Sequence, residues 1–142
     1  MADYYTHFSF IVGLANAEQQ ASALELFRQM SALQQGDEVP AEFPSALKEV
    51  ADDCVFNLDP GSEPHELWFH SDTGGTDAVS AFVQHLLQKL GSTDVVTFEW
   101  SHDCSRPRTD AYGGGAAIIT ASEIKTFTTS EWLQAQLQPA TP

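Results

Sequence analysis

The chain has 142 residues, of which 42% are hydrophobic and 11% aromatic, and its 20 acidic against 6 basic side chains give a formal net charge of −14. This length and apolar content predict a single globular domain, residues 1–142, that buries a core without needing a metal or a disulfide framework. The negative charge argues against direct binding to nucleic acid or to a membrane surface, because both attractions depend on Lys and Arg.

Two further features indicate the compartment. No apolar run approaches the roughly 18 residues that a membrane span needs, and residues 1–14 lack the basic start of a signal peptide. Cys54 and Cys104 are too few for a disulfide framework. We therefore expect a cytoplasmic protein with two free thiols.

The first third of the chain predicts a strand followed by a helix. Residues 7–14, HFSFIVGL, have the bulky and β-branched composition of a core strand. Asn16 and Gln19 form a capping-box pattern at the start of an amphipathic helix that extends to about residue 34 and is ended by Gly36. After a loop, residues 45–51 predict one or two further helical turns.

The middle of the chain predicts a hairpin and a second helix. Two short strands, residues 54–58 and 66–71, flank an expected turn at Asp59-Pro60-Gly61, and alternation separates Leu67 and Phe69 from Trp68 and His70. Residues 79–90 carry an apolar helical stripe that ends at Gly91.

The last third predicts two strands and a terminal helix. Residues 94–100 and 115–121 are expected to pair antiparallel, and Thr128 with Glu131 forms a capping box for the helix. The order β-α-β-β-α-β-β-α predicts an α+β fold whose helices pack on one face of an antiparallel sheet. The simplest such fold is a ferredoxin-like β-α-β-β-α-β core with an extra strand and a short C-terminal helix.

Three short motifs carry a resemblance to known proteins. They are FEW at residues 98–100, CSRPR at residues 104–108 and YGGGA at residues 112–116. With the order of elements, they resemble a group of uncharacterised bacterial proteins with no assigned activity. The resemblance implies a bacterial or bacteriophage-linked origin and names no chemistry.

The segment 97–116 contains the candidate ligand-binding residues. His102, Asp103 and Cys104 are metal-ligand types, but the paired spacing of a metal site is missing, so we expect no metal and no cofactor. Basic neighbours favour a reactive Cys104 thiolate beside His102, whereas a buried and inert thiol is the simpler interpretation.

Arg106 and Arg108 flank Pro107 and are expected to project to the same side of an extended segment, where they suit a carboxylate or phosphate. The alternative that we favour is pairing with nearby Asp103, Asp110 or Glu99. Tyr112 completes the candidate set. Gly113, Gly114 and Gly115 precede a strand and predict a bulge or a close approach of the backbone rather than a phosphate loop.

The sequence contains no catalytic triad, paired catalytic carboxylates or cofactor motif, so no catalytic residue is assigned. We expect a non-enzymatic protein-binding or regulatory module that acts through an acidic surface, with another protein as partner. Two alternatives are an acidic nucleic-acid mimic that occupies a basic groove, and a small-ligand or thiol-dependent enzyme centred on Cys104 and His102. The oligomeric state is left open.

Overall fold

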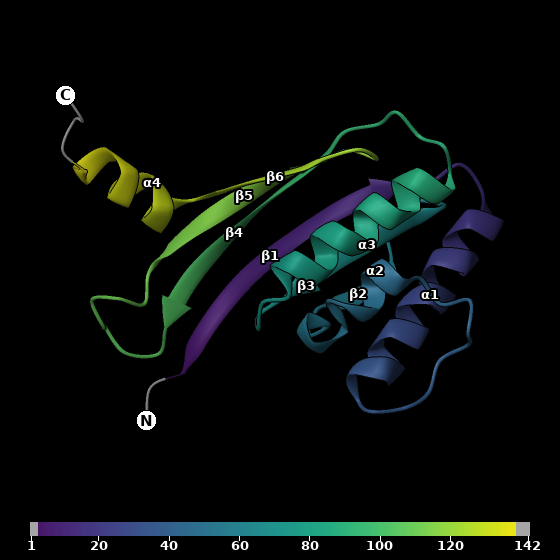
Figure 1. Cartoon of the computed structure of the whole chain (residues 1–142), viewed down its shortest axis with the longest axis horizontal. Coiled ribbons are helices and arrows are strands. Elements are labelled where there is room, and N and C mark those ends of the chain that lie inside the picture. Colours follow the sequence, from purple (N-terminus) through teal and green to yellow (C-terminus); the bar gives the residue numbers. More distant parts are fainter. Residues whose placement is uncertain (1–2, 139–142) are drawn as a thin grey trace.

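The computed structural model describes residues 3–138 as an α+β protein with a six-stranded antiparallel sheet and four helices. The strand order is β2-β3-β1-β4-β5-β6 (Figure 1). The strands are β1 (Tyr4–Gly13), β2 (Asn57–Pro60), β3 (Glu66–Ser71), β4 (Val96–Cys104), β5 (Gly113–Ile119) and β6 (Ile124–Thr128). The helices are α1 (Ala17–Gln34), α2 (Ser45–Lys48), α3 (Thr76–Lys89) and α4 (Thr129–Leu137), with a 3-10 turn η1 (Ala51–Asp53). The α+β class expected from the sequence is confirmed.

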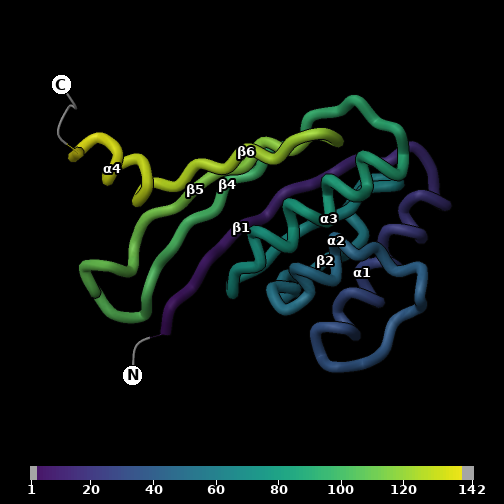
Figure 2. Tube along the Cα trace, in the orientation of Figure 1, coloured from purple at the N-terminus to yellow at the C-terminus, as the bar shows by residue number. Residues whose placement is uncertain are grey.

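Helices α1 and α3 lie on the same side of the sheet (Figure 1), where α1 contacts β2 and α3 reaches β5, with Gln84 donating a 3.2 Å hydrogen bond to the Thr120 carbonyl. Helix α4 lies at the other end of the molecule, beside β5 and β6, and the trace in Figure 2 shows that it follows β6 directly. The sheet therefore has one face that helices cover in part and one face that they leave open.

The core forms where β1, β3 and β4 meet α3. Phe10 of β1 stacks on Phe69 of β3 with ring centroids 4.9 Å apart and on Phe98 of β4 at 4.7 Å. Phe82 of α3 meets Phe69 edge-on at 6.0 Å. Because these rings come from segments far apart in the sequence, the aromatic cluster fixes the central strands and α3 relative to one another.

Helix α1 has the predicted start signal, with one correction, and both long helices are followed by the predicted glycine; α3 begins at Thr76, before the predicted stripe. The Asn16 side chain accepts a hydrogen bond of 2.9 Å from the Gln19 amide at the start of α1. The Gln19 side chain accepts from the Ala15 amide instead of that of Asn16, so the reciprocal bond is displaced by one residue. Gly36 after α1 and Gly91 after α3 adopt φ values of +95° and +60°, which favour glycine.

The predicted hairpin is present, but its first strand and its turn were misplaced. Strand β2 begins at Asn57 because Cys54 ends η1, where its amide bonds to the Ala51 carbonyl. Pro60 belongs to β2 instead of the turn, and the chain turns over residues 61–65. Proline is tolerated there because β2 is an edge strand. The predicted alternation in β3 is confirmed: Leu67 is buried and Trp68 exposed.

The C-terminal part of the sheet is larger than predicted. Strands β4 and β5 pair antiparallel as expected, although β4 continues to Cys104 and β5 occupies residues 113–119. Strand β6 was not predicted at all. The Thr128 cap of α4 is confirmed, since its side chain accepts a bond of 3.2 Å from the Glu131 amide.

The expected close approach at the glycines is observed at Gly115. A Cβ atom on this residue would overlap the Trp100 ring and the Phe127 carbonyl oxygen. We predict that Gly115→Ala lowers the free energy of unfolding by about 1–3 kcal/mol, because the overlap forces neighbouring groups apart. Denaturant unfolding monitored by Trp fluorescence measures this change.

Gly13→Ala is the matched control, because nothing lies within 4 Å of a Cβ atom at Gly13 and its φ is ordinary. Equal stability loss in the two variants would contradict the packing argument.

Candidate functional site

The structure brings two candidate residues of the β4–β5 connection together, because His102 and Tyr112 line one shallow pocket, whereas Cys104, Arg106 and Arg108 do not line it. His102 and Cys104 lie in the last part of β4, whereas Arg106, Arg108 and Tyr112 lie in the loop 105–112. The Nδ1 atom of His102 is 2.8 Å from the Thr6 hydroxyl oxygen. Among residues 3–138, no hydrogen bond joins Cys104 to His102, so this geometry gives no activated Cys-His pair.

The expectation for the two arginines was wrong in both respects. The Arg108 amide donates a 2.8 Å hydrogen bond to the Arg106 carbonyl, so the chain makes a tight turn at Pro107 rather than an extended segment. Tyr112 donates its hydroxyl to the same carbonyl at 3.3 Å. Neither guanidinium forms an ion pair with a carboxylate of the described chain, and both arginines are exposed. Backbone and tyrosine contacts, not arginine pairs, hold this loop.

Neither cysteine belongs to a reactive cluster. Both are free thiols, and burial raises the pKa of Cys54 to about 11. Within residues 3–138, no three His, Cys, Asp or Glu side chains are grouped so that they could hold a metal ion.

A different set of polar residues lies together on the side of the sheet that faces away from α1 and α3, which we call the open face. Side chains alternate along each strand, so every second residue of neighbouring strands points to this side. The strand residues with side chains that we assign to it are Tyr5, His7, Ser9, Ile11, Asn57, Asp59, Glu66, Trp68, His70, Thr97, Glu99, Ser101, Asp103, Ala116, Ile118, Lys125 and Phe127, and Asp72 follows directly after β3.

His7 occupies the centre of the open face and bridges two carboxylates. Its Nδ1 atom lies 2.9 Å from Asp72 Oδ1, and its Nε2 atom lies 3.1 Å from Asp103 Oδ1. Asp72 follows directly after β3 and Asp103 belongs to β4, and these two strands lie on either side of β1. Tyr5, two residues earlier in β1, stacks against the imidazole with ring centroids 5.8 Å apart.

This arrangement favours the charged form of His7. An ionised carboxylate only accepts hydrogen bonds, so a histidine bonded to two of them must donate from both ring nitrogens, as only the imidazolium does. The hydrogen bond to Asp72, followed by that to Asp103, raises the pKa of His7 above its ordinary value of 6.5.

A second histidine lies beside an exposed tryptophan. His70 Nε2 is 2.7 Å from Asp59 Oδ2, and the imidazole stacks on the Trp68 ring with centroids 3.8 Å apart. The Trp68 indole donates a 2.8 Å hydrogen bond to the Ser9 hydroxyl. These contacts hold the Trp68 ring across the neighbouring strands while leaving 38% of the residue exposed.

The open face combines negative charge with exposed apolar groups. Five acidic residues belong to it, Asp59, Glu66, Asp72, Glu99 and Asp103, against one lysine and the His7 imidazolium. Ile11, Ile118 and Phe127 are each between 47% and 48% exposed. Such a surface suits a partner that is cationic and partly apolar, and it repels anions.

Sequence reasoning missed most of this surface. His7, Ser9, Trp68 and His70 were treated as strand residues, and Asp59 was placed in a turn. The available signal was the repetition of polar residues at every second position in the predicted strands. What the sequence lacks is the strand order and register that bring His7 next to Asp72 and Asp103.

The raised pKa of His7 predicts a pH-dependent contribution to stability. A pKa that is higher in the folded than in the unfolded state stabilises the fold below about pH 6.5, and this contribution is lost as pH rises through the folded-state pKa. The difference in unfolding free energy between the wild type and His7→Gln should therefore be larger at about pH 5.5 than at about pH 8.5. Urea unfolding at several pH values measures it.

His85→Gln is the control of opposite sign. Burial, and then the positive charge of Lys89, lowers the pKa of His85, so its contribution should grow as pH rises. The same pH trend in both variants would refute the assignment for His7.

Comparison of the chain with known proteins identified no relative. No family model, no curated protein and no solved structure matches the chain. Within residues 3–138, none of the helices is both long and apolar enough to cross a membrane.

Proposed function

We propose that this protein is a non-enzymatic binding module whose open face contacts a basic protein segment that also carries apolar side chains. The observation that carries this proposal is the His7, Asp72 and Asp103 cluster, surrounded by further carboxylates and by exposed aromatic and aliphatic groups. An uncovered sheet face of this composition offers hydrogen-bond acceptors for Lys and Arg next to apolar contact area.

The negative charge of the open face favours a basic partner. Asp59, Asp72 and Glu99 are exposed, so their carboxylates are accessible to guanidinium and ammonium groups. With a formal net charge of −14, the whole molecule attracts basic partners and repels nucleic acid and anionic membranes. Complementary charge accelerates and orients such an encounter, while apolar contacts supply the part of the affinity that salt does not screen.

A shallow pocket at the edge of the open face provides an apolar contact. It is lined by Ile11 and Trp68 and by Pro60, Gly61 and Ser62 at the end of the hairpin. A partner side chain inserted there would bury the exposed part of the Trp68 ring. Buried aromatic residues of this kind often dominate binding energy at protein interfaces.

The other candidate functions receive less support. Acidic residues also lie on α1, on η1 and in the loop 35–44, so a single phosphate-like array is not favoured over the open face. A thiol enzyme centred on Cys104 and His102 lacks the hydrogen bond that would couple the two groups. The acidic nucleic-acid mimic and the thiol-dependent enzyme are the two alternative functions.

The finer fold assignment and the cellular context belong to the same proposal. The succession β1-α1-β2-β3-α3-β4, with spatial order β2-β3-β1-β4, supports a ferredoxin-like core extended by β5, β6 and α4. The free thiols Cys54 and Cys104 support a reducing, cytoplasmic location.

A peptide titration with charge variants tests the proposal. The probe is a short peptide that contains arginine and leucine, and its control is the same peptide with neutral citrulline in place of arginine. We predict that the triple variant Asp59→Asn, Asp72→Asn, Glu99→Gln weakens binding of the arginine peptide about tenfold, because several charge-assisted contacts are lost. Isothermal calorimetry measures the dissociation constants.

The control triple variant Asp37→Asn, Glu38→Gln, Glu42→Gln removes the same charge from exposed residues in the loop after α1. If the arginine peptide contacts only the open face, this control variant should change the affinity for the peptide less than about twofold. A small change is expected because salt screens the long-range attraction of the removed charges. Equal losses in the two triple variants, or equal binding of the citrulline peptide, would overturn the proposal.

A further inference from the structure

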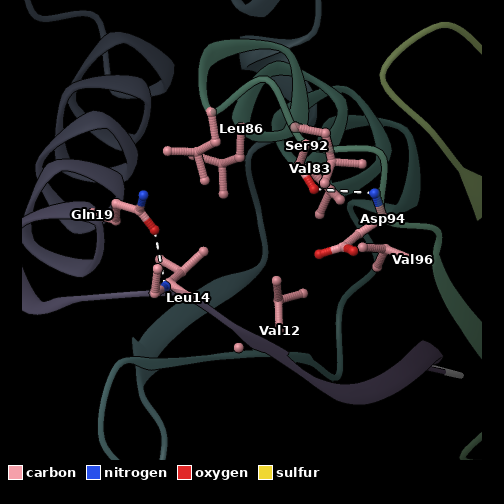
Figure 3. A pocket seen from close by; sticks show the side chains of 12 residues that line it. Val12, Leu14, Gln19, Val83, Leu86, Ser92, Asp94 and Val96 are labelled. Carbon is pink, nitrogen blue, oxygen red and sulfur yellow. Dashed lines mark hydrogen bonds between the residues drawn. The ribbon is translucent and has the colours of Figure 1, made fainter.

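A separate pocket lies on the helix-covered side of the sheet. It is located between the C-terminal end of β1, the start of α1, the C-terminal half of α3 and the segment 90–96 that leads into β4 (Figure 3). Its volume is about 220 Å³. The open face lies on the other side of the sheet, so this pocket is independent of the function proposed above.

The residues that line the pocket are mainly aliphatic. Three of these residues, Val83, Leu86 and Leu87, are buried on α3 and belong to the hydrophobic core. The other apolar lining residues are Val12, Leu14, Ala15, Leu90 and Val96. Water in such a cavity finds few hydrogen-bond partners, so an apolar ligand body displaces it favourably.

Two polar side chains stand at the rim on different sides. Figure 3 shows the Asp94 carboxylate turned toward the pocket and the Gln19 side chain across from it. The Asp94 amide donates a 3.1 Å hydrogen bond to the Ser92 hydroxyl, which orders the segment that carries the carboxylate. The Asp94 carboxylate forms no ion pair within the described part of the chain.

Gln19 is oriented by the cap of α1. Its carboxamide oxygen accepts a 2.9 Å hydrogen bond from the Ala15 amide, so the oxygen is already engaged. The remaining polar side-chain functions at the rim are then the Gln19 amino group, the Ser92 hydroxyl and the acceptor oxygens of Asp94. This pairing offers a negative charge and a neutral donor above an aliphatic cavity.

From this geometry we propose that the pocket binds a small organic cation, a primary amine on a compact hydrocarbon body, with the ammonium group at Asp94. The Asp94 carboxylate stands beside apolar walls, so an ammonium group can form a charge-assisted hydrogen bond with it while the hydrocarbon body enters the aliphatic pocket. The same carboxylate repels anionic ligands.

The volume limits the size of the ligand. A protein cavity of about 150 Å³ holds a benzene molecule. A pocket of about 220 Å³ therefore accommodates one six-membered ring with a short aminoalkyl arm. The probe of this class that we choose is 2-phenylethylamine.

The test compares ligands that share one body and differ in charge. Amide chemical shifts of the full chain are followed during titration with 2-phenylethylamine, with neutral 2-phenylethanol and with anionic phenylacetate. The amine should bind most tightly and should shift the amides of Gly13, Leu14, Asp94 and Val96, which line the pocket.

Asp94→Asn should weaken amine binding about tenfold and leave the binding of the alcohol unchanged, because only the charge-assisted contact is lost. Asp94 is exposed, so this substitution is compatible with folding. Asp110→Asn is the matched control, since it removes the same charge from the exposed loop at the other end of β4. Shifts confined to other residues, equal affinity for amine and alcohol, or no effect of Asp94→Asn would overturn the proposal.

Discussion

The alternation of side chains along β1 is the constraint on which the rest of the structure depends. This strand pairs with β3 over residues 8–13 and with β4 over residues 4–7, and it joins the two halves of the sheet. On the helix side, Phe10 stacks on rings from β3 and β4. On the open face, His7 bonds carboxylates next to the same two strands. A slip of one residue would exchange the two sides, so packing and polar contacts specify one register.

The same constraint separates two functional surfaces. Residues on one side of β1 contribute to the aromatic core and, through Val12, to the pocket next to Asp94. Residues on the other side contribute His7 and Ser9 to the open face. A small amine at the pocket and a basic protein segment at the open face are therefore distinct proposals, although both follow from accessible carboxylates beside apolar groups in an acidic molecule.

The sequence predicted what periodicity and local signals determine. The apolar stripe of α3, the Asn16 and Thr128 caps, and the alternation in β3 all depend on neighbouring residues. Strand β6 was not predicted because residues 122–130, SEIKTFTTS, form a mostly polar edge segment that is stabilised by pairing with β5. In the loop, a backbone turn at Pro107 replaces the expected extended segment, and neither arginine forms an ion pair with a carboxylate of the described chain. The His7 cluster requires residues 7, 72 and 103 to meet, and no local pattern specifies that register.

Mapping the contact surface of the arginine peptide by NMR shows whether the open face is the binding surface. We expect the largest shifts at the Trp68 indole and at the amides of Ile11, Asp72 and Asp103, and we expect them to weaken as salt is raised. Shifts concentrated on α1 and α3, with the Trp68 indole unaffected, would contradict the assignment of the open face as the binding surface.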